Sequence, residues 1–109
     1  MATFFRNTVT KEIGTVPVRV LETGPATRAT VIGFSIANLT ENVVTISVLL
    51  QDDTSVTGYY AKDIILPSQS SLRIVNGGEK LILAPSNQLY VVSNTSNSVD
   101  AILTYVEII

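Results

Sequence analysis

Apolar and polar or small residues alternate with a period of two along most of the chain. Ile32, Phe34 and Ile36 fall on one side of segment 30–38, with smaller residues between them. Segment 44–50 repeats the pattern, with valine, isoleucine or leucine at every second position. Because successive side chains of a β-strand point to opposite faces, the pattern predicts long strands with one face in a core.

The same alternation predicts further strands, and turn residues separate them. Pro17 cannot donate a ladder hydrogen bond, so the strand around it is expected at the edge of a sheet. The polar stretch 39–42 has hairpin length, and Asn76-Gly77-Gly78 offers the positive φ of a tight hairpin turn. The additional strands are expected at 4–13, 16–22, 58–66, 71–75, 80–83, 89–93 and 99–109.

Eight to nine short strands without a helical pattern are typical of an all-β fold. We expect a single antiparallel β-sandwich, either jelly-roll or immunoglobulin-like. The expected core comprises the inward apolar positions of these strands: Ile32, Phe34, Ile36, Val44, Ile46, Val48, Leu81, Leu83, Leu89, Val91, Leu103 and Tyr105.

The domain organisation follows from the same reading. Residues 15–109 are expected to form the β-sandwich domain, and residues 1–14 an N-terminal arm or the first strand. Phe4 and Phe5 leave two alternatives open. They belong either to a first strand that fills the core or to an arm that docks on a neighbouring subunit.

The charge content bears on whether the protein is a monomer. Only 15% of the residues are charged, and the net charge is −2, whereas an average domain carries about 25% charged residues. A surface so poor in charge promotes association, so we expect a homo-oligomer that buries part of its surface permanently. The chain shows no basic patch for nucleic acid and no apolar run long enough to span a membrane.

The residue types needed for common catalysis are missing. The chain has no histidine and no cysteine, which removes the usual general base, the strongest nucleophile and the ligands of most zinc sites. We therefore expect no enzyme, no cofactor and no metal site. The adjacent pair Asp52-Asp53 is interpreted as a solvated turn, with a calcium site as the lesser alternative.

Four motifs stand out in the second half of the chain: GYYAKDIIL at 58–66, PSQSSL at 67–72, GGEKLILAPSN at 77–87 and VDAILTYVEI at 99–108. With these motifs, the chain resembles small β-sandwich virion proteins of tailed bacteriophages, especially those of marine and cyanobacterial phages, over roughly residues 28–109. Many such chains carry Gly-Asp where this one has Ser86-Asn87. The resemblance implies a virion location, as a capsid decoration or cement protein, a neck or collar component, or a tail accessory.

Two functional hypotheses follow. In the first, the protein is a non-enzymatic virion structural protein that assembles with itself and docks on capsid, portal/neck or tail proteins, with Phe4, Phe5, Val9 and Pro17 as candidate interface residues. In the second, it is a carbohydrate- or cell-surface-binding module of a fibre or tail tip. Aromatic rings can stack on sugars, so that module would use the pair Tyr59-Tyr60 as its ligand patch.

Overall fold

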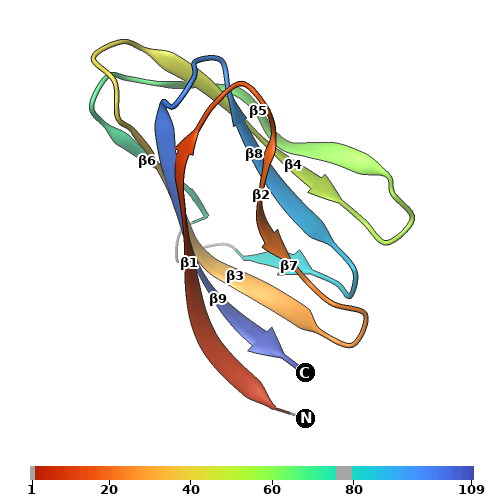
Figure 1. Cartoon of the computed structure of the whole chain (residues 1–109). Helices are drawn as coiled ribbons and strands as arrows, with labels where there is room; N and C mark the ends of the chain where they lie inside the picture. Colours follow the sequence, from red (N-terminus) through yellow and green to blue (C-terminus); the bar gives the residue numbers. More distant parts are fainter. Residues whose placement is uncertain (1, 76–79) are drawn as a thin grey trace.

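A computed structural model describes residues 2–75 and 80–109. The described residues form nine strands and no helix (Figure 1). The Asn76-Gly77-Gly78 turn expected from the sequence lies outside them. The strands are β1 (Thr3–Ile13), β2 (Val18–Glu22), β3 (Arg28–Asn38), β4 (Val44–Gln51), β5 (Thr57–Leu66), β6 (Ser71–Val75), β7 (Leu81–Leu83), β8 (Gln88–Ser93) and β9 (Val99–Ile108).

The strands form two antiparallel sheets that pack as a sandwich, which confirms the predicted fold class. Sheet A has the order β1-β9-β3-β6, with β7 also paired to β3, and sheet B has the order β2-β8-β4-β5. The pairs β1–β9, β2–β8, β3–β6/β7 and β4–β5 are nested inside one another. This nesting is the topology of a jelly roll rather than of an immunoglobulin domain.

The core lies between the sheets and contains every expected residue except Ile32. The others are buried, with Phe34 and Leu103 among the largest side chains. At Ile32 the prediction is wrong because the pairing of β3 with β9 shifts register between Val31 and Gly33. Such a bulge inserts one extra residue and changes which side chain faces inward. Val31 is therefore fully buried, while Ile32 is only half-buried.

The stretch 39–42 does turn the chain, but β3 and β4 do not pair as a hairpin because they lie in different sheets. The side chain of Asn38 holds this crossing. Its Nδ2 donates to the carbonyl oxygens of Asn42 (2.8 Å) and Pro67 (3.0 Å), and its Oδ1 accepts the Thr40 N–H (2.9 Å). β6 and β7 do not pair with each other either. β6 pairs with residues 34–37 of β3, and β7 pairs with residues 29–31 of the same strand.

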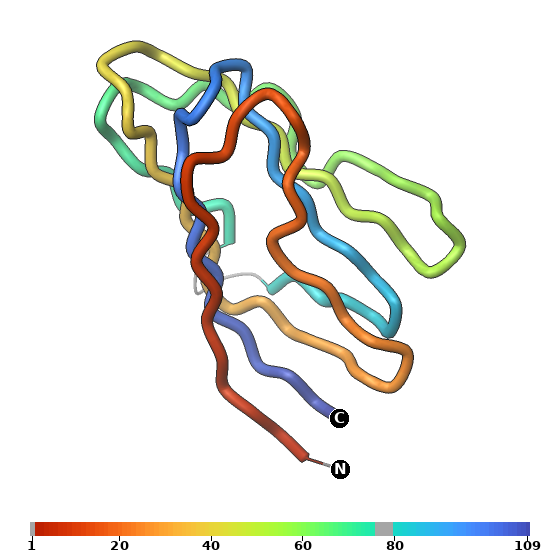
Figure 2. Tube along the Cα trace, in the orientation of Figure 1, coloured from red at the N-terminus to blue at the C-terminus, as the bar shows by residue number. Residues whose placement is uncertain are grey.

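β1 is the outermost strand of sheet A. It runs beside β9 to the end of the molecule where both chain ends lie (Figure 2). There Ala2 N–H donates to Ile109 O (3.0 Å) and Ile109 N–H to Ala2 O (2.9 Å). Phe4 and Phe5 are exposed, so this strand does not fill the core with them. The described residues offer no helix with the length and apolar character that crossing a membrane requires.

Candidate assembly surface

The side chains that point from sheet A away from the core form a broad surface, here called the outer A face. Residues paired across antiparallel strands point to the same side. Tyr105 and Leu103 of β9 are buried, so the alternating residues Ile102, Thr104 and Val106 point outward. Their β1 partners Val9, Asn7 and Phe5 therefore share the outer A face.

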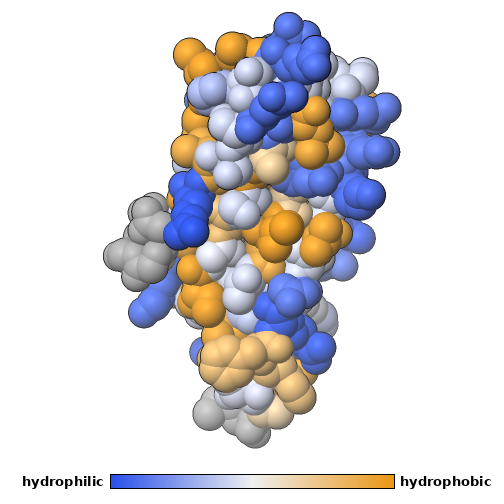
Figure 3. All heavy atoms as spheres, turned by 90° about the vertical axis from the view of Figure 1, so that its left-hand side faces the viewer, coloured by the Kyte–Doolittle hydropathy of each residue, from blue (hydrophilic) through white to orange (hydrophobic). Residues whose placement is uncertain are grey.

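Large apolar side chains are exposed on this face. Phe5 is 79% exposed, Val9 58% and Ile102 46%, and Ile82 of β7 is 65% exposed beside its partner Thr30. Figure 3 views the side that lies to the left in Figure 1. It shows apolar groups in the middle and lower part of the view, with strongly hydrophilic groups between them as well as along the margins. The polar members of the face are small uncharged residues: Asn7, Thr30, Ser35 and Thr104.

On the outer A face one charged residue, Arg73, lies beside Ser35 toward the middle, and the other charged residues lie at the ends of the sheet. Arg28 pairs with Ile108 at one end of the sheet, Asp100 pairs with Ala37 at the other, and Arg73 lies on the edge strand β6. A face with so few charged groups loses little solvation when a partner covers it.

Arg6, the one charged residue in the middle of β1, points to the opposite side. Its Nε lies 2.9 Å from Oε1 of Glu107, and its guanidinium lies 4.9 Å from the ring centre of Phe4. Both contacts keep the charge away from the outer A face.

A shallow hollow of about 180 Å³ opens in the middle of the outer A face. Its lining includes Gly33, which has no side chain, together with Ile32, Ile102 and Arg73. Ile32, which the bulge removes from the core, therefore borders this hollow. The hollow makes this part of the outer A face concave.

The edges of the two sheets differ in protection. β2 has five residues, follows Pro17 and carries the Arg19–Glu22 ion pair. β5 has two register shifts, one of them at Lys62 and Asp63. Short strands, proline, charge and bulges are the usual devices that prevent edge-to-edge pairing. By contrast, β1 pairs with β9 without interruption from Thr3 to Thr10. The expected edge position of the strand next to Pro17 is confirmed.

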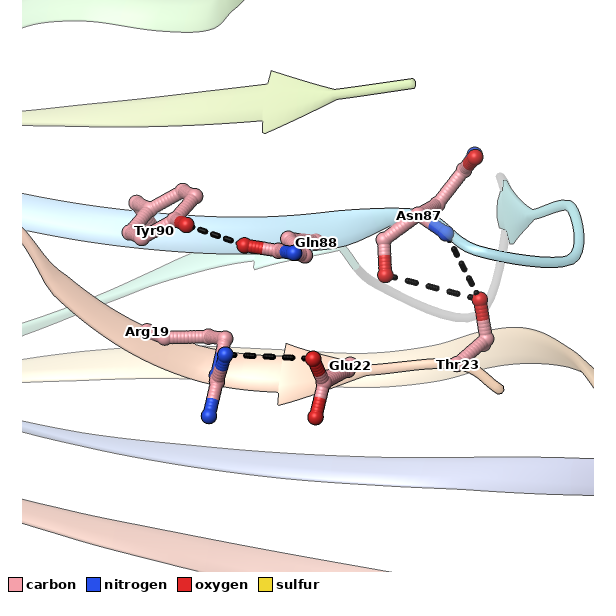
Figure 4. A network of polar contacts seen from close by, with 6 residues as sticks. All are labelled: Arg19, Glu22, Thr23, Asn87, Gln88 and Tyr90. Atoms are coloured by element: carbon pink, nitrogen blue, oxygen red, sulfur yellow. Dashed lines mark hydrogen bonds and ion pairs between the residues drawn. The ribbon is translucent and has the colours of Figure 1, made fainter. Parts of the chain in front are cut away.

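Polar pairs characterise the corresponding region of sheet B (Figure 4). Nη1 of Arg19 lies 3.1 Å from Oε2 of Glu22 on β2, and Tyr90 OH donates to Oε1 of Gln88 on the neighbouring strand β8. Because Arg19 pairs with Tyr90 and Glu22 with Gln88, these four side chains share the outer face of sheet B. Their hydrogen-bonding groups already partner one another within the chain.

Thr23, drawn beside Asn87 in Figure 4, links two of the connections that run between the sheets. Its Oγ1 accepts the Asn87 N–H (2.9 Å) and donates to the Ala84 carbonyl (2.6 Å). Both Thr23 and Asn87 are buried. These bonds tie the connection from β2 to β3 to the turn before β8.

The structure gives Tyr59 and Tyr60 different surroundings. Tyr59 is exposed on the outer face of sheet B opposite Leu49, with the Lys62 ammonium 5.4 Å from its ring centre. Tyr60 is the extra residue of a bulge and packs half-buried against the core. Both border a shallow hollow of about 330 Å³, but they do not form one flat stacking platform.

Asp52 belongs to a closed turn, as expected for the Asp52-Asp53 pair. The Thr54 hydroxyl and N–H donate to Oδ1 of Asp52 at 2.7 and 2.9 Å, and the Val56 N–H donates at 3.1 Å. The hydroxyl bond, followed by the two backbone bonds, lowers the pKa of Asp52 below its ordinary value of 3.8. Among the described residues, no three acidic side chains gather into a group that could hold a metal ion.

The candidate interface residues fall in two places. Phe4, Phe5 and Val9 lie on β1, where Phe4 points to the inner side and the other two to the outer A face. Pro17 is exposed just before β2, at the edge of sheet B. Sequence reasoning missed Ile82 and Ile102, although both stand between buried neighbours. An apolar residue at the outward position of a strand was the signal that could have identified them.

Comparisons with known proteins show the fold. The sequence matches no protein-family profile and no curated protein sequence. A subunit of the disulfide-linked pili that form Bacillus endospore appendages superposes with a TM-score of 0.57 and 6% identity, over 96% of this chain and 86% of that one. VP2 of the infectious bursal disease virus subviral particle superposes with a TM-score of 0.51 and 11% identity, over 97% of this chain and 32% of that one. At these identities the likeness concerns the jelly-roll fold alone.

Proposed function

We propose that this protein is a non-enzymatic structural component of a tailed-phage virion, which assembles with itself and docks on other virion proteins. The observation that carries the proposal is the outer A face. It exposes Phe5, Val9, Ile82 and Ile102 around small polar residues, and its charged residues are few: Arg73 beside Ser35, and Arg28 and Asp100 at the two ends. Contiguous apolar surface of this kind marks interaction sites in soluble proteins.

Three further observations support an assembly role. The low charge content favours association. The two fold neighbours are described as a pilus subunit and a viral particle protein, so this jelly roll can serve as a building block. The resemblance of residues 28–109 to phage virion proteins favours a virion location and suggests the candidate partners: capsid, neck or tail.

The absence of catalysis is part of the proposal. The sequence contains neither histidine nor cysteine, and the hollows of the outer A face and of the β4–β5 tip are shallow and open. The mechanism is then burial: apolar side chains of the outer A face leave water when a partner covers them, and that burial provides the binding free energy.

Two measurements test the proposal. Quantitative mass spectrometry of purified virions should detect the chain at a fixed copy number. A number that scales with the major capsid protein indicates capsid decoration, and a small ring-sized number indicates the neck or the tail. Sedimentation of the purified protein should show oligomers. A monodisperse monomer that is also missing from virions contradicts the proposal.

A further inference from the structure

The free edge of β1 presents a regular row of unpaired backbone groups. Ala2 and Ile109 exchange both of their N–H···O bonds, and the register stays constant from there to Thr10↔Ala101. In an antiparallel pair, bonded and non-bonded residue pairs alternate. The even-numbered residues of β1 therefore bond to β9. The N–H and C=O groups of the odd-numbered residues point to the free edge: Thr3, Phe5, Asn7 and Val9.

This edge is suited to receive another strand. Among the described strands, β9 is the sole pairing partner of β1. Residues 3–10 contain no proline, no lysine and no bulge, and their one charge, on Arg6, points inward and is paired with Glu107. A long, regular and nearly uncharged edge is a template for strand addition.

We propose that β1 pairs antiparallel with β1 of a second copy, around a two-fold axis that passes between the two Asn7 residues. The inference rests on the proposed assembly function and names its first contact. In this register Asn7 faces Asn7 of the second copy. Phe5 of each copy faces Val9 of the other, so this pair occurs two times. All of these residues carry free edge groups, so each facing pair exchanges two backbone hydrogen bonds.

Other registers are less favourable for reasons of charge and length. An axis at Arg6 places two guanidinium groups directly opposite one another, which is destabilising. An axis at Thr8 sets the Phe5 ring against the Lys11 ammonium group. An axis at Phe5 pairs only residues 3–7 of the strand and leaves Val9 outside.

The Asn7 axis, by contrast, makes two apolar cross-strand pairs on the outer A face. The two side-chain amides at the axis each carry a donor and an acceptor, so they can bond to each other. The resulting dimer joins two copies of sheet A into one continuous sheet. The two outer A faces then form a single surface of doubled extent with Phe5 and Val9 in its centre, which is the surface offered to the larger assembly.

Replacing Asn7 by proline tests the edge directly. The Asn7 N–H does not bond to β9, so Asn7→Pro keeps the pairing within the chain, and proline is tolerated on edge strands. It removes both donors of the central pair, which should raise the dimer Kd about a hundredfold or more. The matched variant Asn7→Ala keeps the N–H and should remain dimeric. Sedimentation gives the Kd, and thermal unfolding shows that both variants fold.

A cysteine scan tests the register even if the proline variant does not fold. The chain has no cysteine of its own, and paired residues in antiparallel strands lie within disulfide reach. Mild oxidation should link Asn7→Cys to itself. It should also link Phe5→Cys to Val9→Cys when the two variants are mixed, but should not link either one efficiently to itself. Efficient self-linkage of Phe5→Cys or Val9→Cys, with none at Asn7, overturns the register.

The two levels of the proposal fail differently. Oligomers that persist in Asn7→Pro and never cross-link at Asn7 overturn the β1 pairing but leave assembly through the outer A face intact. A wild-type protein that stays monomeric and is missing from virions overturns both.

Discussion

The outer A face and the outer face of sheet B cover the same core but carry different exposed side chains. Sheet B also exposes large apolar groups, Ile65 and Tyr59, but Lys62 lies over the Tyr59 ring and the Arg19–Glu22 pair occupies its edge. On sheet A the charge in the middle of β1 points inward. The two faces therefore differ in where their charged side chains lie more than in how much apolar surface they expose.

The edges repeat this contrast. β2 and β5 are interrupted or shielded by proline, charge and register shifts, whereas β1 is regular over its first eight residues, Thr3 to Thr10. A protein that needed to avoid association on every side would have protected β1 as well. Matched substitutions in the two sheets test this difference.

The largest effect is expected between the two faces of one strand. Leu103 is fully buried, so Leu103→Ala should lower the free energy of unfolding by about 2–5 kcal/mol. Its neighbour Ile102 points to the outer A face, and Ile102→Ala should cost less than about 1 kcal/mol in the monomer. Chemical denaturation measures both. Equal losses would mean that Ile102 is packed as tightly as Leu103 in the monomer and does not point to solvent.

The next effect concerns association. Phe5→Asp places a charge at the most exposed apolar position of the outer A face and should weaken self-association roughly thirtyfold, as expected for an aromatic anchor worth ~2 kcal/mol. Ile65→Asp is the matched change on sheet B, where the side chain is 67% exposed, and should leave association unchanged. Sedimentation at several concentrations compares them. If Ile65→Asp is the more harmful, the docking face has been assigned to the wrong sheet.

A smaller effect is expected at the corner that joins the sheets. Thr23→Val removes the acceptor of the buried Asn87 N–H and the donor to Ala84 O. This should cost about 1–2 kcal/mol of unfolding free energy, because a buried donor loses its partner. Association per folded molecule should not change. The serine variant, which restores the hydroxyl, serves as the control in the same thermal and sedimentation measurements.

The smallest effect is expected at the β4–β5 tip. Asp52 has a pKa below 3.8 in the folded protein because Thr54 and Val56 donate to its carboxylate. Its contribution to stability is therefore present above the unfolded pKa and is lost as the pH falls through the folded pKa. NMR titration should place the midpoint below 3.8, and Thr54→Ala should move it upward. An unshifted midpoint would show that the turn does not hold the carboxylate.

Local alternation was enough to predict the strands and nearly the whole core. Segment 44–50 needed only its own sequence, because side-chain direction in a strand alternates strictly. Pro17 marked an edge for an equally local reason, the missing N–H. Ile32 was assigned wrongly because a bulge depends on how β3 pairs with β9, some seventy residues later in the chain.

Pairing partners and exposure could not be derived in the same way. The stretch 39–42 has the chemistry of a hairpin, but it leads from sheet A to sheet B, because β3 finds better partners in strands distant in sequence. Phe4 and Phe5 have the composition of core residues, and only the place of β1 beyond β9 shows that they face solvent. Both the outer A face and the edge of β1 arise from such non-local pairing.

The nested order of strands has a consequence for the route by which the chain folds. Among the described strands, only β4 and β5 are neighbours both in sequence and in a sheet. β9 lies between β1 and β3, so the first and the last of the described strands must meet before sheet A is complete. Loop closure over such separations is slow, so we expect substitutions in residues 99–108 to slow refolding more than equivalent substitutions in β4 or β5.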